Sequence, residues 1–369
     1  MKITKITPLT LRYPHGRPIQ DATIPPPPPG AAGRAGLFVH VETDAGVTGL
    51  GVGNPHPSVS VTIERTLGPL LEGEDPFNIE KLWEKMFWQV RGYGRKGVAF
   101  CALSAIDIAL WDLKAKALGV PLYRLLGPYH ERVPIYGSGG WTHFTEAELV
   151  AEQTGYIERL GVRAVKMKVA KDFGKAERED IRRLAAVRKA VGDDVEVLVD
   201  ANNGYYAKQA IAMAHAFEDY RVGWFEEPVL ADDIDGLAAV ARASRIPVAT
   251  GEHEYTKYGF KDLIARGGAD IVQPDVGRVG GVTEWLKAAH LAHAFNLPVA
   301  PHAFQLVHLH LAMATPNLRI VEYLGVSEEG DRIFYTEFPQ PKDGYWAPYP
   351  DKPGLGLELD PRAVEQYRV

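Results

Sequence analysis

Three acidic residues have the type and spacing needed to hold a metal ion. Asp200, Glu226 and Glu252 are separated by 26 and again by 26 residues, and each lies at the end of a short apolar run. Three carboxylates that converge on one point repel one another unless a cation lies between them. Ligands that are all oxygen favour Mg²⁺, Mn²⁺ or Ca²⁺ over zinc. We therefore predict a Mg²⁺ site here; the alternative is unrelated surface acids, or acids paired with lysines.

Two lysines and a histidine at the ends of other runs can move protons. Lys166 and Lys168 are two residues apart, so strand alternation places both ammonium groups on one face. The second ammonium and a metal ion would both lower the pKa of Lys168, as a base requires. His302 titrates near neutral pH, and Asp275 on the adjacent run can hold one of its ring nitrogens. A lone histidine is more often a core residue, but this acidic neighbour and the strand-end position favour catalysis.

The positions of these groups indicate removal of a proton next to a carboxylate. Lys168 and His302 come from the second and seventh of eight runs, with the acids on the runs between them. The enediolate formed by such a proton transfer carries two negative charges, which a divalent cation and the Lys166 ammonium can stabilise. Glu322 on the last run can donate a hydrogen bond to the same oxygen if its pKa is raised enough to keep it protonated.

Eight short apolar runs that alternate with helical stretches must position these residues. An open doubly wound sheet is the alternative to a barrel, but no G-x-G-x-x-G pattern follows a first strand. Eight consecutive strand–helix units therefore predict an α/β fold with a parallel barrel, whose mouth receives the residues at the strand ends. The runs are Val133–Gly137, Ala164–Val169, Val195–Asp200, Gly223–Glu227, Pro247–Glu252, Asp270–Asp275, Pro298–His302 and Arg319–Tyr323.

The chain changes character near residue 130. Before this point the sequence predicts a hairpin of Phe38–Glu42 with Val47–Gly53, followed by a helix from about Ala99 to Leu118. After Leu324 the alternation stops and a tail rich in glycine and proline follows. We expect residues 1–130 to form an α+β capping domain to which 325–369 return, and 131–324 to form the barrel. The five prolines Pro25–Pro29 predict either a stiff polyproline spacer or a loop over the barrel mouth.

Composition excludes several classes of function. The 369 residues carry a net charge of −6, so no broad basic surface is available for nucleic acid or anionic lipid. No stretch has the length of a membrane span or the pattern of a signal peptide. A single cysteine, Cys101, excludes an internal disulfide and fits a reducing compartment. We expect a cytoplasmic protein.

Together these residues resemble a known family. The set Lys-x-Lys, Asp-x-Asn, Glu-Glu-Pro, Gly-Glu, Asp, His and Glu, in this order, is similar to the mandelate racemase group of the enolase superfamily. The segment Ala105–Asp112 and the closing Pro-Gly-Leu-Gly motif are similar too, so the resemblance covers nearly the whole chain. It implies a (β/α)7β modified TIM barrel with a capping domain, and Mg²⁺ as cofactor. Asp107 and Asp112 look structural by the same resemblance.

The resemblance also implies a role for each site residue. The metal ligands would be Asp200, Glu226 and Glu252; the acid/base groups would be Lys168 and the His302–Asp275 pair; Lys166 would bind the substrate carboxylate, Glu322 the enediolate and Asn202 the substrate. Specificity is expected from capping-domain loops near residues 14–36 and 53–60. Candidate contacts there are His15, Arg17, Arg34 and His56, although a solvated loop residue is the simpler interpretation of any one. Relatives are commonly homo-oligomers, so we expect one here.

The net reaction is left open by the resemblance. Gly251–Tyr255 and Gln273–Gly277 are similar to acid-sugar dehydratases including those of rhamnonate, whereas the full set of bases is closer to those of fuconate, galactarate and tartrate. In a dehydratase the His302 imidazolium protonates the leaving β-hydroxyl and a 2-keto-3-deoxy acid results. We expect an aldonate or aldarate dehydratase of this kind. A racemase or epimerase, a sugar-lactone cycloisomerase and a non-catalytic binding protein are the alternatives, the last disfavoured by the paired bases.

Overall fold

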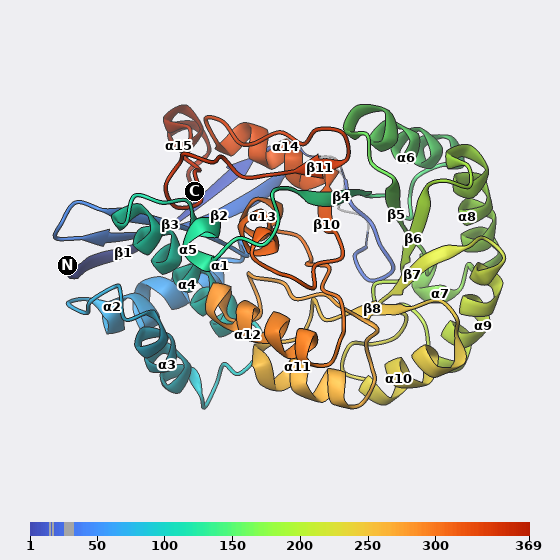
Figure 1. Ribbon diagram of the computed structural model, residues 1–369, viewed down its shortest axis with the longest axis horizontal. Coiled ribbons are helices and arrows are strands. Elements are labelled where there is room, and N and C mark those ends of the chain that lie inside the picture. The colour runs from blue at the N-terminus through green and yellow to red at the C-terminus, as the bar shows by residue number, and fades with distance from the viewer. Residues whose placement is uncertain (15, 17, 26–32) are drawn as a thin grey trace.

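The structure is a computed structural model that describes residues 1–14, 16, 18–25 and 33–369 (Figure 1). A three-stranded antiparallel sheet in the order β1–β2–β3 and the long helix α4 dominate the N-terminal part, the capping domain. Its elements are β1 (Ile3–Tyr13), β2 (Arg34–Thr43), β3 (Thr48–Gly53), α1 (Pro57–Thr62), the π-helix η1 (Ile63–Leu67), α2 (Gly68–Leu71), α3 (Ile79–Val90), α4 (Val98–Ala117) and α5 (Leu122–Leu126).

Helix α4 packs very closely against β3. A Cβ atom at Gly49 or Gly51 would lie only 2.1 Å from the carbonyl oxygen of Ala109 or Ala105, so glycine is required at these alternate strand positions. The predicted hairpin and helix are present with small changes at their ends. Strand β1 was not predicted; it lies at the edge of the sheet beside β2, and an edge strand tolerates the proline at position 8.

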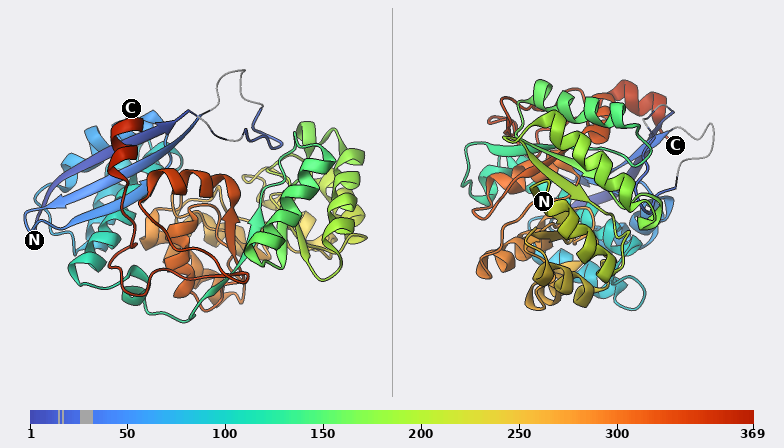
Figure 2. Two further views of the ribbon diagram at one scale, coloured as in Figure 1. Left: turned by 90° about the horizontal axis from the view of Figure 1, so that it is seen from above. Right: turned by 90° about the vertical axis from the view of Figure 1, so that its right-hand side faces the viewer.

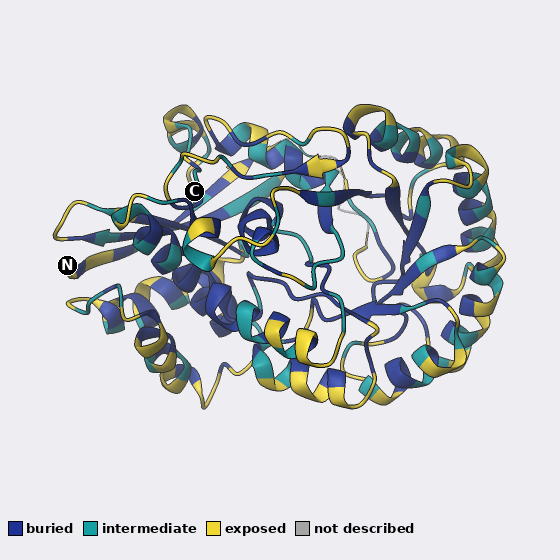
Figure 3. Ribbon diagram, in the orientation of Figure 1, coloured by how far each residue is buried: buried dark blue, intermediate teal, exposed yellow. Residues whose placement is uncertain are grey.

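The second part of the chain curls a mainly parallel sheet into a barrel with helices outside it (Figures 1 and 2). The strands are buried while the outer faces of the helices are exposed (Figure 3). Its elements are β4 (Val133–Ser138), α6 (Glu146–Leu160), β5 (Ala164–Lys168), α7 (Lys171–Gly174), α8 (Glu177–Val191), β6 (Glu196–Asp200), α9 (Ala207–Glu218), β7 (Val222–Glu226), α10 (Ile234–Ala243), β8 (Val248–Thr250), α11 (Thr256–Ala265), β9 (Ile271–Val272), α12 (Gly281–Ala294), α13 (Gln305–Met313) and β10 (Val321–Leu324).

The seventh predicted strand is reduced to a single residue. Val299 forms isolated parallel bridges with Val272 on one side and Leu318 on the other, and these close the ring between β9 and β10. Pro298 and Pro301 flank this position, and proline has no N–H to extend a ladder. The predicted (β/α)7β barrel is confirmed, with its seventh strand shortened for this reason.

The C-terminal segment runs back from the barrel to the capping domain. Helix α14 (Gly325–Phe334) packs on β2 and α15 (Pro361–Tyr367) on β1, while β11 (Tyr345–Trp346) pairs with β4. The Leu355 amide, in the Pro-Gly-Leu-Gly motif, donates to Asp112 Oδ1 of α4 at 2.6 Å. The domain limits at residues 130 and 324 stay predictions. In the described part of the chain, no helix has both the length and the hydropathy needed to cross a bilayer.

Candidate active site

Strand register brings charged residues side by side at one end of the barrel. Lys168 on β5 is in register with Asp200 on β6, and Asp200 is in register with Glu226 on β7. Glu252 follows the end of β8 after Gly251, whose φ of +133° turns the chain there. All four side chains are buried. The parallel strands therefore place three acids and one lysine in one buried region at their carboxyl ends, where the sequence predicted these residues.

The two lysines of this region are bonded to two of the acids. Lys166 Nζ lies 2.5 Å from Glu226 Oε1 and 3.1 Å from Glu322 Oε1, and Lys168 Nζ donates to Asp200 Oδ2 at 2.5 Å. Burial lowers the pKa of Lys168, but the Asp200, Glu226 and Glu252 carboxylates together outweigh burial, and the net shift is upward. Asp200 stabilises the ammonium form in this arrangement, and the low pKa expected for Lys168 beside a metal ion stays a prediction.

Glu322 also differs from its prediction. Burial raises its pKa, but the positive charges of Lys166 and His302 outweigh burial and lower the pKa to about 2. Its Oε2 accepts a hydrogen bond from the Ala303 amide at 2.7 Å, which favours the carboxylate further. The protonated Glu322 required for hydrogen-bond donation is thus not the form that these neighbours favour.

His302 lies between two acids at the seventh strand position. Its Nδ1 is 2.8 Å from Asp275 Oδ2, the predicted pair, and its Nε2 is 3.2 Å from Glu252 Oε2. Burial lowers the pKa of His302, but Glu252 and Asp275 outweigh burial and raise it to about 9. The imidazolium is the stable form at neutral pH in this arrangement. Arg278 on the loop after β9 also contacts both acids, at 3.2 Å from Glu252 Oε1 and 3.6 Å from Asp275 Oδ2.

Several buried oxygen atoms near the predicted ligands have no hydrogen-bond partner. They are Glu252 Oε2, Asn202 Oδ1 and Gln273 Oε1. Buried polar atoms are nearly always satisfied, and unpaired oxygens beside carboxylates fit a hard cation such as Mg²⁺. Among the described residues, the acids and histidines whose ligand atoms lie within 4.8 Å of one another are Glu227, Glu252 and His253. Of the predicted ligands, Asp200 and Glu226 bond to lysines.

Several residues that lie in this region had no role predicted from the sequence. Gln273 Nε2 donates to Glu226 Oε2 at 2.9 Å, and Glu227 accepts from the Asn203 side chain at 2.8 Å. The signal was available for two of them, because Glu227 and His253 directly follow predicted ligands in the sequence. Arg278 had no such signal, since only the loop after β9 folds it back to Glu252.

The predicted substrate contacts are only partly brought to the site. Asn202 is buried beside Asp200, whose Oδ1 accepts its amide N–H at 2.8 Å. His56 caps α1 by accepting the Ser58 amide at Nδ1 and is exposed, which agrees with the simpler interpretation of a surface loop residue. Arg34 begins β2, opposite Tyr13. The predictions for His15, Arg17 and Pro26–Pro29 lie outside the described residues. All site roles stay predictions.

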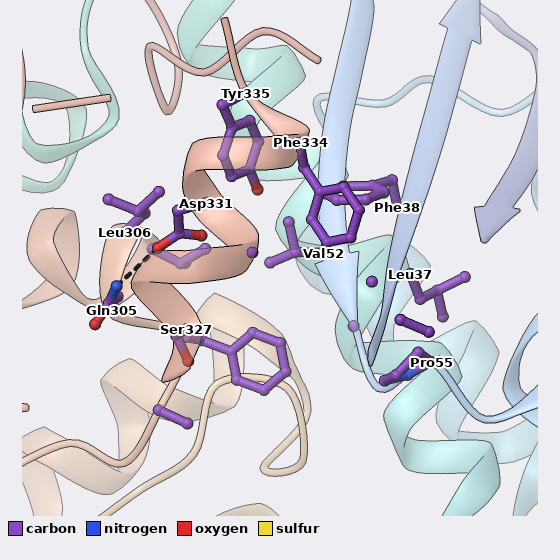
Figure 4. Close-up of a pocket in the computed structure, with 17 residues that line it drawn as sticks. Leu37, Phe38, Val52, Pro55, Gln305, Leu306, Ser327, Asp331, Phe334 and Tyr335 are labelled. Atoms are coloured by element: carbon purple, nitrogen blue, oxygen red, sulfur yellow. Dashed lines mark hydrogen bonds between the residues drawn. The ribbon is translucent and has the colours of Figure 1, made fainter. Parts of the chain in front are cut away.

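A cavity of about 220 Å³ lies between β2, the end of β3, and helices α13 and α14 (Figure 4). Its wall is mainly apolar, with Leu37, Phe38 and Phe334 among its lining residues, and it includes Ala303, which bonds to Glu322. No lysine, arginine or histidine is among the described residues that line it. Asp331 accepts from Gln305 Nε2 at 2.7 Å, and burial raises the pKa of this carboxyl to about 7.

Two family models match the chain and together cover most of it. The N-terminal domain of the mandelate racemase / muconate lactonizing enzyme family matches residues 32–127, and an enolase C-terminal domain-like model matches residues 148–363. The chain is therefore an enzyme of the enolase superfamily. Within it, the chain belongs to the mandelate racemase/muconate lactonizing enzyme family, which confirms the predicted recognition.

Individual relatives agree with this membership. An arabinonate dehydratase of Saccharolobus solfataricus is 34% identical over 341 residues, covering 90% of this chain and 90% of the relative. A 3,6-anhydro-alpha-L-galactonate cycloisomerase of Streptomyces coelicolor is 35% identical over 328 residues, covering 88% and 89%. The crystal structure of an L-talarate dehydratase from a Polaromonas species, complexed with Mg and L-glucarate, superposes with a TM-score of 0.89 at 36% identity, covering 100% of this chain and 97% of that one.

Proposed function

We propose that this enzyme is a Mg²⁺-dependent acid-sugar dehydratase that forms a 2-keto-3-deoxy acid. The observation that supports it best is the pair of proton-transfer groups on two sides of one acidic cluster. Lys168 contacts the cluster through Asp200 at 2.5 Å, and His302 contacts it through Glu252 at 3.2 Å. The α-carbon of a substrate bound between these two groups has a base on one face, and an acid lies within reach of the adjacent β-carbon.

The donor set of the cluster fits Mg²⁺. Asp200, Glu226 and Glu252 would hold the ion, and all of their ligand atoms are oxygen. The bound ion would supply positive charge to the substrate carboxylate as negative charge develops there. The structure of an L-talarate dehydratase with Mg supports this assignment by family membership.

The protein's own residues then carry out the proton transfers. Lys168 takes the α-proton as a neutral amine, after its ammonium group has left Asp200 Oδ2 and released one proton to solvent. Lys166 donates to the substrate carboxylate, whose oxygens gain charge in the enediolate. The His302 imidazolium, oriented by Asp275, gives its proton to the β-hydroxyl, and the C–O bond breaks to release water. The remaining enol takes a proton at carbon to become the 2-keto acid.

The lining of the cavity at Ala303, whose amide donates to Glu322, supports one kind of acid sugar over another. A substrate whose far end entered this cavity would meet apolar side chains and the Asp331 carboxyl, without a cation among the described lining residues. A second carboxylate would lose hydration there without a partner. We therefore expect aldonates, whose far end is uncharged, to be better substrates than aldarates of matched stereochemistry.

The decisive experiment is product analysis with a matched panel of aldonates, aldarates and sugar lactones in Mg²⁺ buffer. A dehydratase gives a keto acid that semicarbazide detects by absorbance. Change of optical rotation without keto acid would identify a racemase instead, and loss of lactone without keto acid a cycloisomerase. No α-proton exchange into deuterated water with any compound would identify a binding protein.

The His302→Asn variant tests the division of roles. It removes the acid but leaves Lys168 in place, so we expect dehydration to be lost while α-proton exchange at the face of Lys168 continues. The NMR signal of the α-proton in deuterated water reports this exchange. Full turnover by the variant would show that His302 is not the acid.

A further inference from the structure

A second row of polar side chains runs alongside the predicted metal ligands. Asn203, Glu227 and His253 lie just after the ends of β6, β7 and β8, where the ligands are predicted. Asn203 Nδ2 donates to Glu227 Oε2 at 2.8 Å, and His253 Nδ1 lies 2.6 Å from Glu227 Oε1. Both oxygens of Glu227 are therefore engaged, and one continuous chain of hydrogen bonds joins three strand ends.

The backbone at these positions is held in an unfavourable conformation. The φ angles of Asn203 and Glu227 are +66° and +39°, in the left-handed region that non-glycine residues seldom adopt. Asn203 is fixed there because its Oδ1 accepts from the Ala231 amide at 2.7 Å and its own amide donates to the Glu227 carbonyl at 2.9 Å. Such conformations persist where the surroundings fix them, and they cluster at functional sites.

This row contacts the ligand ring at Glu252. His253 Nδ1 is 3.7 Å from Glu252 Oε1, and Arg278 contacts the same oxygen from another side at 3.2 Å. The other oxygen, Oε2, has no hydrogen bond and lies 3.2 Å from His302 Nε2. His253 and Arg278 thus orient the Glu252 carboxylate through Oε1, and they would remain in place if Oε2 exchanged His302 for an ion.

Resting on the proposed function, we propose that Glu227 and His253 are positioning residues that set the affinity of the site for its divalent cation. Residues that orient metal ligands without touching the metal typically contribute 10- to 100-fold in metal affinity. His253 is suited to a clean test because 45% of its side chain is exposed, so its removal leaves little cavity in the core.

The test is a titration of the full-length, EDTA-treated protein with Mn²⁺, read from the electron paramagnetic resonance of free Mn²⁺. We expect His253→Leu to raise the Kd by about 10- to 100-fold. His253→Asn can still donate a hydrogen bond to Glu227 and should recover most of this loss. The matched control is His215→Leu, since His215 on α9 is also an exposed histidine, and its ring hydrogen-bonds to the Ala243 carbonyl at the end of α10. The Kd of this control should equal that of the wild type.

Other outcomes separate this inference from the proposed function. If wild-type protein binds Mn²⁺ and Glu226→Gln abolishes binding while His253→Leu leaves the Kd unchanged, the positioning role is wrong and the metal site stands. If wild-type protein binds no Mn²⁺, the metal site itself is wrong. Two Mn²⁺ ions per chain, one of them lost in His253→Leu, would make His253 a ligand and overturn positioning. Glu227→Gln provides a second test of the same row, and its Kd should rise too.

Discussion

Two of the regions that contain buried carboxylates in this enzyme, helix α4 and the barrel mouth, stabilise them differently. In α4, Asp112 accepts the backbone amides of Leu50 at 2.7 Å and Leu355 at 2.6 Å, and Asp107 accepts the Thr283 amide at 2.9 Å. At the barrel mouth, Asp200 and Glu226 are held mainly by the side chains of Lys168 and Lys166.

This difference distinguishes an acid with a structural role from an acid that can take part in binding or catalysis. A backbone amide is fixed by the fold and cannot leave its acceptor, so Asp107 and Asp112 tie the capping domain to the barrel and the tail. A lysine side chain has several rotatable bonds and can exchange its partner for a cation or a substrate. Buried acids held by side-chain cations, with unpaired oxygens nearby, are therefore the ones to test for chemistry.

The largest effect is expected for Glu226→Gln at the mouth. The change removes a negative charge and a predicted ligand, while Lys166 keeps Glu322 as a partner at 3.1 Å. We expect kcat/KM for the best acid sugar to fall on the order of 10³-fold or more, together with a large rise in the Kd for Mn²⁺. Thermal melting of the EDTA-treated variant should stay near that of the wild type. Unchanged metal affinity would remove Glu226 from the ligand set.

Asp112→Asn should have the opposite profile. The amide group would turn an N–H₂ toward either the Leu50 or the Leu355 amide, leaving a buried donor without an acceptor. We expect the free energy of unfolding to fall by about 3 kcal/mol, measured by urea denaturation. The activity of the remaining folded enzyme should be normal. A folded variant with impaired kcat would contradict the structural assignment.

Asp107 should make stability depend on pH. Burial raises the pKa of Asp107 from 3.8 to about 7 against the opposing hydrogen bonds of Thr283. Between these values the folded state binds more protons than the unfolded state, so this group lowers the free energy of unfolding as pH rises from about 4 to 7. Asp107→Asn lacks this titrating group. Its loss in the free energy of unfolding relative to wild type should be smaller at pH 8 than at pH 5, by at least about 1 kcal/mol. A penalty independent of pH in urea denaturation would show that Asp107 does not titrate in this range.

The barrel could be predicted because each strand carries its own apolar run. The location of the candidate site could be predicted because the carboxyl ends of parallel strands meet at one end of a barrel. The sequence placed His302 next to Asp275 correctly, since both follow neighbouring strands. It could not predict the protonation states of Lys168 and Glu322, because these depend on which carboxylate oxygen each lysine ammonium group contacts. Local sequence does not encode those contacts, because they join residues on different strands through side-chain rotamers.

The capping domain was harder to predict for a related physical reason. Strand β1 is an edge strand with a proline, so its pattern is weak, and the sequence between β1 and its partner β2 contains the proline run. Arg278 was missed because only tertiary structure brings it to Glu252. The row of Asn203, Glu227 and His253 could have been suspected, since a polar residue closely follows each of the three predicted ligands.

The smallest effect is expected for Lys116→Met, which compares a lysine–carboxylate pair of each region. Lys116 Nζ lies 2.7 Å from Asp112 Oδ2, nearly the same separation as that between Lys166 and Glu226, but 28% of its side chain is exposed. Asp112 keeps both backbone amides when the lysine is removed, so we expect a loss of only about 1 kcal/mol in the free energy of unfolding and no change in kcat/KM. Lys166→Met is the matched change at the mouth, where it should abolish turnover because no backbone donor replaces the ammonium beside Glu226. Equal effects of the two substitutions on activity, or a loss of stability above about 3 kcal/mol for Lys116→Met, would show that lysines and backbone amides neutralise buried acids interchangeably in this enzyme.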